Sequence, residues 1–151
     1  MEESISKEQI ADLRGDIKTE LEPFGYSPLS LAYLGDSVMD LLVKSYFVTN
    51  SNKQTYKYHK EVTDIVNAKN QAMYADLIYD TLDEDEQDVF RRGRNVKTHS
   101  KAKNATMGEY RKATGLEALY GYLYLKGNFE KLHALTDDMI VRHLQQTVTD
   151  K

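Results

Sequence analysis

The chain has 151 residues, 40% of them hydrophobic and 29% charged, and it contains no cysteine. This length favours a single domain with its own core, and the composition is typical of a globular protein. The lack of cysteine excludes disulfide bonds, cysteine-ligated zinc and thiol catalysis, and fits a reducing cytoplasm. The acidic start, Met1 to Ser4, lacks the apolar segment of a signal peptide, and the apolar stretch from Ala118 to Leu125 is too short to span a bilayer. We therefore expect a cytoplasmic protein without a membrane partner.

Charge is distributed unevenly along the chain. The net charge is −4, but residues 91–112 contain eight basic residues and one acid, so this segment carries +7 and the remainder −11. Such a local excess predicts a patch that faces a polyanion on an otherwise acidic body. A solvated, flexible loop is the equally weighted alternative. The basic residues are Arg91, Arg92, Arg94, Lys97, Lys101, Lys103, Arg111 and Lys112.

Apolar residues at three- and four-residue spacing predict helices in the first half of the chain. A first amphipathic helix is expected over 6–21, before a break that contains Pro23 and Gly25. Ser27 is a predicted N-cap, because proline follows it at the first helical position. The next helix, about 28–48, is apolar nearly all round and is expected to be central. A long amphipathic stretch then extends from Tyr58 to Leu77.

Capping signals define the predicted helices of the second half. Asp83 and Glu86 cap a short helix that ends near Gly93, and residues 94–105 have no apolar periodicity and are predicted to form a loop. Thr106-x-x-Glu109 is a capping box that opens a helix ending at Gly127. A last helix is expected over about 128–146. Without strand pairs, the fold class is predicted to be all-α, as a helical bundle.

Two acids lie in apolar helical segments. Asp36 belongs to the 28–48 helix and Glu117 to the 106–126 helix, and we expect both to be buried. Gly35 and Gly121 lie within about one turn of them, which indicates close helix packing. If the two helices cross there, the carboxylates meet. A buried acid must be paired or bind a metal.

Two carboxylates suit Mg²⁺, which is commonly held by one or two acids together with waters and phosphate oxygens. Such an ion activates water and stabilises a leaving oxygen in phosphodiester hydrolysis. A buried salt bridge to a lysine or arginine is the alternative that the pattern leaves open. Asp40 lies one turn after Asp36, and we interpret it as the partner of Lys44 in an exposed ion pair, with an indirect role near a metal left open. The four histidines have no ligand spacing.

Two motifs resemble the ribonuclease III family. Residues 31–38, LAYLGDSV, are similar to its signature, and residues 113–121, ATGLEALYG, are similar to its second motif. The segments around Arg91 to Asn95 and Lys103 to Gly115 resemble its short Mini-III members in particular. The resemblance covers about 28–145 of a single domain spanning 1–151, which leaves 1–27 as an N-terminal helical extension.

The resemblance implies a homodimeric, all-α endonuclease that cleaves double-stranded RNA with Mg²⁺, or Mn²⁺ as a substitute, and leaves 5′-phosphate and 3′-hydroxyl ends. It implies catalytic and metal-binding roles for Asp36 and Glu117. It further implies maturation of the paired ends of precursor large-subunit (23S) ribosomal RNA, with a ribosomal protein or ribosomal particle as a further partner. We expect no double-stranded-RNA-binding domain after Lys151. We therefore assign RNA binding to the eight basic residues of the 91–112 segment and to Asn104.

Two positions depart from the family pattern. Ala32 stands where the family has a glutamate, and Thr114 stands where it has an aspartate. Half of the usual four acids are therefore replaced. This keeps a second hypothesis open, in which the chain is a catalytically silent helical module that binds structured RNA or a ribosomal particle. A helical dimer without any role in RNA metabolism is the third.

Overall fold

A computed structural model describes residues 21–97 and 104–149. Within these ranges every regular element is helical, which confirms the predicted all-α class. The predicted helix over 6–21, except for Leu21, and the residues 98–103 lie outside the described residues. The elements are η1 (Pro23–Gly25), α2 (Pro28–Asn50), α3 (Thr55–Val66), α4 (Ala68–Ile78), η2 (Tyr79–Thr81), α5 (Glu84–Arg94), α6 (Met107–Lys126) and α7 (Phe129–Thr149).

Local capping explains where several helices begin and end. The Ser27 hydroxyl accepts a hydrogen bond from the Ser30 backbone N–H at 3.1 Å, with Pro28 in the first turn of α2. Both predicted capping boxes are present, at the N-termini of α5 and α6. Gly127 ends α6 in the left-handed region, with φ of 79°. These predicted helix ends are therefore confirmed to within one or two residues.

The long amphipathic stretch is divided into two helices, α3 and α4. Asn67 separates them in an extended conformation, and its side-chain oxygen accepts the Asn70 N–H at 2.9 Å. The Asn67 amide also donates to the Thr63 carbonyl, so one residue closes α3 and caps α4. The prediction of one continuous stretch was wrong because this break uses neither proline nor glycine.

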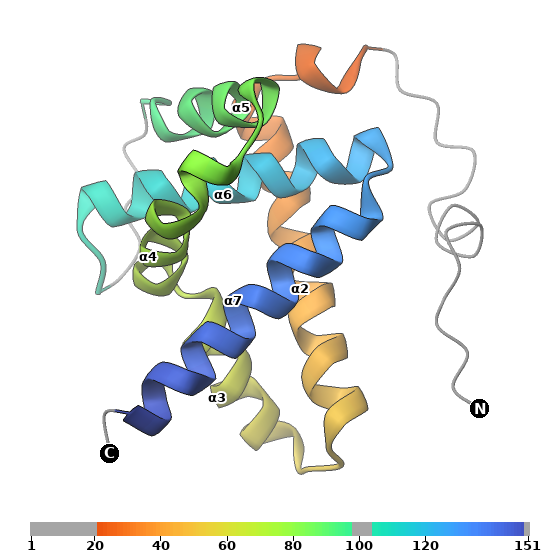
Figure 1. Ribbon diagram of the computed structural model, residues 1–151, viewed down its shortest axis with the longest axis vertical. Helices are drawn as coiled ribbons and strands as arrows, with labels where there is room; N and C mark the ends of the chain where they lie inside the picture. The colour runs from red at the N-terminus through yellow and green to blue at the C-terminus, as the bar shows by residue number, and fades with distance from the viewer. Residues whose placement is uncertain (1–20, 98–103, 150–151) are drawn as a thin grey trace.

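Helix α6 is the centre of the bundle. It packs against α2, α4 and α5, and Figure 1 shows α2 running behind it at a steep angle while α5 lies alongside. Leu116, Leu119 and Leu123 of α6 are fully buried. Helix α7 crosses the lower half of the molecule and contributes Leu132, Met139 and Ile140 to the same core (Figure 1). This arrangement brings the predicted 28–48 and 106–126 helices into contact.

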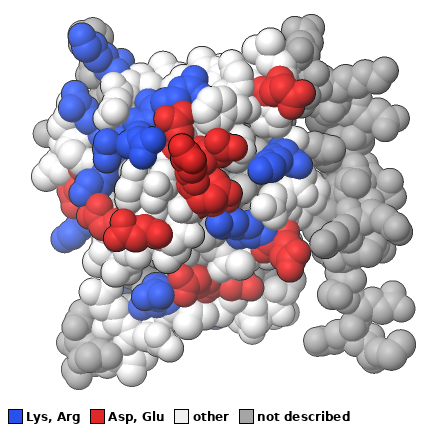
Figure 2. Space-filling view, turned by 45° about the horizontal axis from the view of Figure 1, so that its top comes forward, with Lys and Arg blue, Asp and Glu red and all other residues white. Residues whose placement is uncertain are grey.

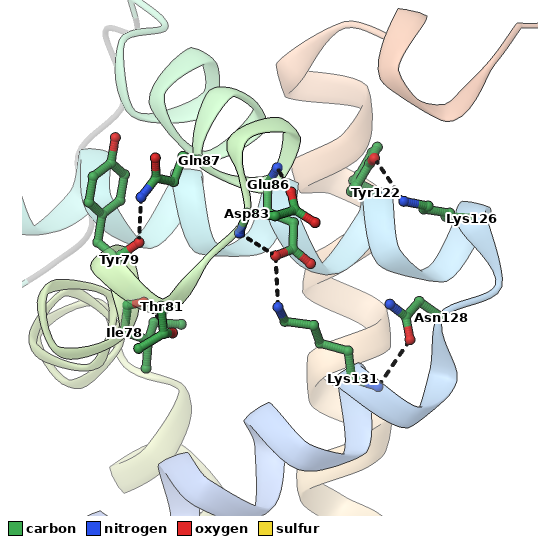
Figure 3. Close-up of polar contacts among 10 residues, drawn as sticks. All are labelled: Ile78, Tyr79, Thr81, Asp83, Glu86, Gln87, Tyr122, Lys126, Asn128 and Lys131. Carbon is green, nitrogen blue, oxygen red and sulfur yellow. Dashed lines mark hydrogen bonds and ion pairs between the residues drawn. The ribbon is translucent and has the colours of Figure 1, made fainter.

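A polar cluster ties α5 to α7. Glu86 is almost fully buried, and one of its carboxylate oxygens accepts both the Asp83 N–H at 2.9 Å and the Lys131 ammonium at 2.7 Å (Figure 3). Lys131 lies on α7, near Asn128 at the turn that follows α6 (Figure 3). Because removal of one partner would leave a buried charge unpaired, this ion pair fixes the start of α5 relative to α7. The other end of α5 carries the arginines discussed below.

None of the helices in the described ranges is long and apolar enough to cross a membrane.

Candidate active site

The site is built where α2 and α6 cross with their backbones in contact. A Cβ added to Gly35 would come 1.7 Å from the Glu117 carbonyl oxygen, and one added to Gly121 would come 2.0 Å from the Leu31 carbonyl oxygen. Real Cβ atoms do not approach this closely, so only glycine fits at either position. The sequence signal of a glycine near each acid therefore marks a close approach of two helices.

Asp36 and Glu117 meet beside this crossing, and their side chains lie within hydrogen-bonding reach of each other. A hydrogen bond between two carboxyl groups requires a proton on one of them. Burial is the main reason that the pKa of Glu117 rises from 4.5 to about 9, and the hydrogen bond and negative charge of Asp36 raise it further. Without a cation, the pair therefore holds a proton at neutral pH.

The expectation that both acids are buried was wrong for Asp36, which is exposed, whereas Glu117 is partly buried. Leu31, Gly35 and Met39 form the buried stripe of α2, and Asp36 lies about 100° around the helix from Gly35. The apolar residues around Asp36 in the sequence did not show whether its side chain lies on the buried or the exposed side of the helix. The result is a site with one sheltered and one solvent-accessible carboxylate.

The donor set fits Mg²⁺. Among the described residues, neither carboxylate forms an ion pair with lysine or arginine, so the alternative of a buried salt bridge is not what the structure contains. No group of three or more potential ligands from His, Asp and Glu is present in the part of the chain that the structure describes. Two carboxylates with water and phosphate oxygens are nonetheless a usual set for this ion.

The two departures from the family pattern lie next to the pair. Ala32 is buried and offers no oxygen. The Thr114 hydroxyl donates to the Tyr110 carbonyl of its own helix at 3.0 Å. Asp40 forms the predicted ion pair with Lys44, at 2.8 Å between Oδ2 and Nζ, and both side chains are well exposed. His59 and His133 are exposed on α3 and α7.

Three arginines of the basic segment belong to the last turn of α5 and already contact the protein. Arg91 donates to the Tyr79 hydroxyl at 2.8 Å and lies beside Asp88. The Arg92 guanidinium donates to the Phe24 carbonyl at 3.0 Å and covers the Phe24 ring. Arg94 lies over the ring of Phe90. These contacts position η1 and η2 against α5. If Arg91 and Arg92 also bind RNA, they do so in addition to these contacts within the protein.

The remaining basic residues differ in their surroundings. Lys97 and Arg111 are exposed, whereas Lys112 forms an ion pair with Asp76 of α4 at 2.9 Å. Asn104 is exposed with φ of 67°, the left-handed conformation that asparagine tolerates. Lys101 and Lys103 lie outside the described residues. Figure 2 shows basic surface gathered on one side of the molecule next to an acidic area.

Sequence reasoning did not identify a row of exposed apolar side chains on α2. Tyr33 is 85% exposed, and three further residues along the same helix are more than half exposed: Leu29, Leu41 and Val48. The spacing of four, eight and seven residues keeps them near one side of the helix. The sequence shows that this helix is apolar nearly all round. Which of its apolar residues remain exposed depends on how α2 crosses α6.

Comparisons with known proteins identify the family of this chain. Residues 29–128 match the ribonuclease III domain family. A Mini-ribonuclease 3 from Thermoanaerobacter is 47% identical over 106 residues, which cover 70% of this chain and 75% of that protein. A Mini-ribonuclease 3 from Staphylococcus aureus is 39% identical over 116 residues, covering 76% and 87%. A crystal structure of a Fusobacterium nucleatum protein matches with a TM-score of 0.71 and 33% identity, covering 77% of this chain and 93% of that one.

The family match spans about two thirds of the chain, and it includes both helices that carry the carboxylate pair. Members of the family act on double-stranded RNA and generally use a divalent metal. The chain therefore belongs to the ribonuclease III family, in its Mini-ribonuclease 3 branch, and is an endoribonuclease.

Proposed function

We propose that the chain hydrolyses double-stranded RNA at a Mg²⁺ ion held by Asp36 and Glu117. The observation that carries this proposal is the contact between the two carboxyl groups beside the glycine crossing. Two carboxylates in contact repel each other when both are charged, so one of them holds a proton. A bound cation would replace this proton and stabilise both negative charges. Mn²⁺ would serve as a substitute, because the same oxygen ligands suit it.

The chemistry that the ion supplies is activation of water and stabilisation of the leaving oxygen. The residues of the chain hold and orient it. Glu117 provides a sheltered carboxylate, and Asp36 provides one that faces solvent, where a phosphate of the duplex can approach. The backbone contact between α2 and α6 keeps the two carboxylates at a fixed separation, as positioning for catalysis requires.

RNA binding is assigned to the basic residues at the end of α5, in the following segment and at the start of α6. A-form duplexes present a major groove too deep and narrow for side chains to read, so contacts to phosphates and 2′-hydroxyls are expected. Arg111 and Lys97 are the described members that are exposed, and Lys101 and Lys103 complete the set. Arg91, Arg92 and Lys112 would contribute while keeping their protein contacts.

The exposed row on α2 supports a homodimer. Leu29, Tyr33, Leu41 and Val48 expose large apolar side chains in the described structure. Water-exposed apolar surface of this extent on one helix is typical of a protein interface. In a two-fold dimer built on this row, each α2 would bring its own Asp36 near the interface, so two sites would face one duplex.

For the natural substrate, we propose the paired ends of precursor 23S ribosomal RNA, processed in the cytoplasm. This assignment rests on the relationship to Mini-ribonuclease 3 proteins. A ribosomal protein or ribosomal particle would then present the RNA and supply selectivity.

The test is a cleavage assay with two substrates, a generic RNA duplex and precursor ribosomal RNA, each in Mg²⁺ and in chelator, followed by mapping of the ends. We expect Mg²⁺-dependent cutting of both strands with 5′-phosphate ends, and preferred cutting at the paired ends of the precursor. Cleavage that persists in chelator would refute the metal site. Cutting of the generic duplex but not of the precursor would refute the assigned substrate.

The alternative that Ala32 and Thr114 left open, a silent RNA-binding module, is disfavoured because the chain belongs to a family of endoribonucleases. It predicts binding of the duplex without cleavage at any Mg²⁺ or Mn²⁺ concentration, so the same assay separates the two.

A further inference from the structure

Asp40 is an acid that the carboxylate pair does not include, although it lies one helical turn beyond Asp36 on α2. Its side chain is 41% exposed, and its partner in the described structure is Lys44, whose side chain is 60% exposed. Exposed ion pairs of this kind contribute little to stability. Asp40 is therefore free to exchange this partner for another cation.

The carboxylate pair leaves most of the coordination shell of a Mg²⁺ ion to other ligands. The ion has about six ligands, and those that the protein does not supply are water and RNA oxygens. Water molecules on a cation donate hydrogen bonds, so they need acceptors around them. The Ala32 side chain supplies none, and the Thr114 hydroxyl, which donates to the Tyr110 carbonyl, offers only an uncharged acceptor.

The position of Asp40 suits contact through water and not direct coordination. Residues four apart on a helix have Cβ atoms about 5–6 Å from each other, which places their side chains on the same side. A carboxylate that binds a water of Mg²⁺ lies about 4–5 Å from the ion, from a metal–oxygen distance near 2 Å and a hydrogen bond near 2.7 Å. Asp40 also belongs to no group of three potential ligands in the described part of the chain.

We propose that Asp40 is a positioning residue that holds the divalent ion of the Asp36–Glu117 site through water, and that Lys44 competes with the ion for it. The inference rests on the proposed metal site. It adds a third negative charge to a site in which the family's acids at positions 32 and 114 are missing. Lys44 then weakens metal binding by occupying Asp40 when the ion is absent.

The experiment compares Asp40→Asn and Lys44→Gln, which remove opposite ends of the same ion pair. Asp137→Asn is the matched control, because Asp137 is an exposed acid on α7. Mn²⁺ binding to the RNA-free protein is measured from the electron paramagnetic resonance signal of the free ion. We expect Asp40→Asn to weaken binding about tenfold, the lower end of the range for residues that orient a metal site. Lys44→Gln should tighten it, and Asp137→Asn should leave it unchanged.

Cleavage is then followed as a function of Mg²⁺. Asp40→Asn should raise the Mg²⁺ concentration that gives half-maximal cleavage, and Lys44→Gln should lower it. Asp40→Glu, which keeps the negative charge, should have a half-maximal concentration close to that of the wild type. If the two variants shift in the same direction, or if Asp40→Asn binds Mn²⁺ like the wild type, the inference is overturned. Failure of the wild type to bind Mn²⁺ or to cut RNA would instead overturn the proposed function.

Discussion

Gly35 of α2 and Glu117 of α6 touch through their backbones, since a Cβ on Gly35 would come 1.7 Å from the Glu117 carbonyl oxygen. The position of a proposed metal ligand is therefore set by a residue that has no side chain. The same contact makes the crossing intolerant of any larger residue.

Gly35→Ala should push α6 away from α2 and separate the two carboxylates. Overpacking of this kind costs about 1–3 kcal/mol, and more where backbone atoms must move. Thermal unfolding should show a lower Tm, and cleavage should fall by at least about a hundredfold. Gly108→Ala in the first turn of α6 is the control, because its Cβ would lie 3.9 Å from its nearest neighbour. Equal activity of the two variants would show that the crossing does not position the site.

Asp36→Asn and Glu117→Gln should each abolish cleavage, while the proteins remain folded and bind RNA. Each substitution removes a negative charge that the ion requires and keeps the size of the side chain. Turnover of a labelled duplex, together with binding in the presence of chelator, measures the two properties separately. Activity at the wild-type level in either variant would exclude that residue from the site.

Stability without metal should depend on pH through Glu117. The pKa of Glu117 is about 9 in the folded chain, above its usual value of 4.5, so the folded state binds the proton more tightly than the unfolded state. Folding is therefore favoured by this group below about pH 4.5, and the advantage is lost as pH rises towards 9.

Glu117→Gln lacks this dependence. In chelator, the Tm of Glu117→Gln should equal that of the wild type near pH 4 and exceed it by several degrees near pH 9. Thermal unfolding of both proteins at a series of pH values measures this difference. Addition of Mg²⁺ should reduce the difference, because the ion stabilises the wild-type carboxylates. A difference that shrinks as pH rises would contradict the assigned cause.

Replacement of Lys101 and Lys103 by alanine should weaken duplex binding about equally for all sequences and leave folding unchanged. Each phosphate contact contributes about 0.9 to the slope of log K against log salt for duplex DNA, so the RNA slope should fall by up to about two. Titrations at several salt concentrations measure this. Lys57→Ala with Lys60→Ala, exposed on α3, is the charge-matched control. If both double variants behave alike, the loss reflects net charge and not a binding segment.

Tyr33→Asp should convert the expected homodimer to a monomer, because it places a charge in the exposed apolar row of α2. Light scattering at micromolar concentration measures the mass, and a duplex cleavage assay should show loss of coordinated cutting of both strands. Val148→Asp is the control, since Val148 is 73% exposed on α7, away from this row. A wild type that is monomeric and still cuts both strands would refute the dimer.

Features encoded by neighbouring residues could be predicted from the sequence, and features set by tertiary contacts could not. Ser27, Asp83, Thr106 and Gly127 act within a few residues, so the helix ends that they define were expected. The break between α3 and α4 was not predicted, although Asn67 is a residue type that often caps the N-terminus of a helix. The exposure of Asp36 depends on how α6 crosses α2, and no local pattern records that.

The basic segment 91–112 also combines a feature that is visible in the sequence with features that depend on tertiary contacts. Its charge is visible in the sequence, but the partners of its arginines are distant: Phe24 lies 68 positions from Arg92, and Tyr79 lies 12 from Arg91. Only the fold shows that these arginines also hold 3₁₀ turns in place. Substitution of Arg92 would therefore change stability as well as RNA binding.

The backbone contact between α2 and α6 also limits how the enzyme can choose its substrate. No side chain lies between the helices at that point, so nothing there can rearrange to suit one RNA over another. We therefore expect the proposed active site to be rigid and to cleave only a phosphodiester that the bound RNA places correctly between its ligands. Discrimination between duplexes must then come from how well each RNA bends and seats on the surrounding surface, and selection of new specificities should alter that surface while leaving the crossing intact.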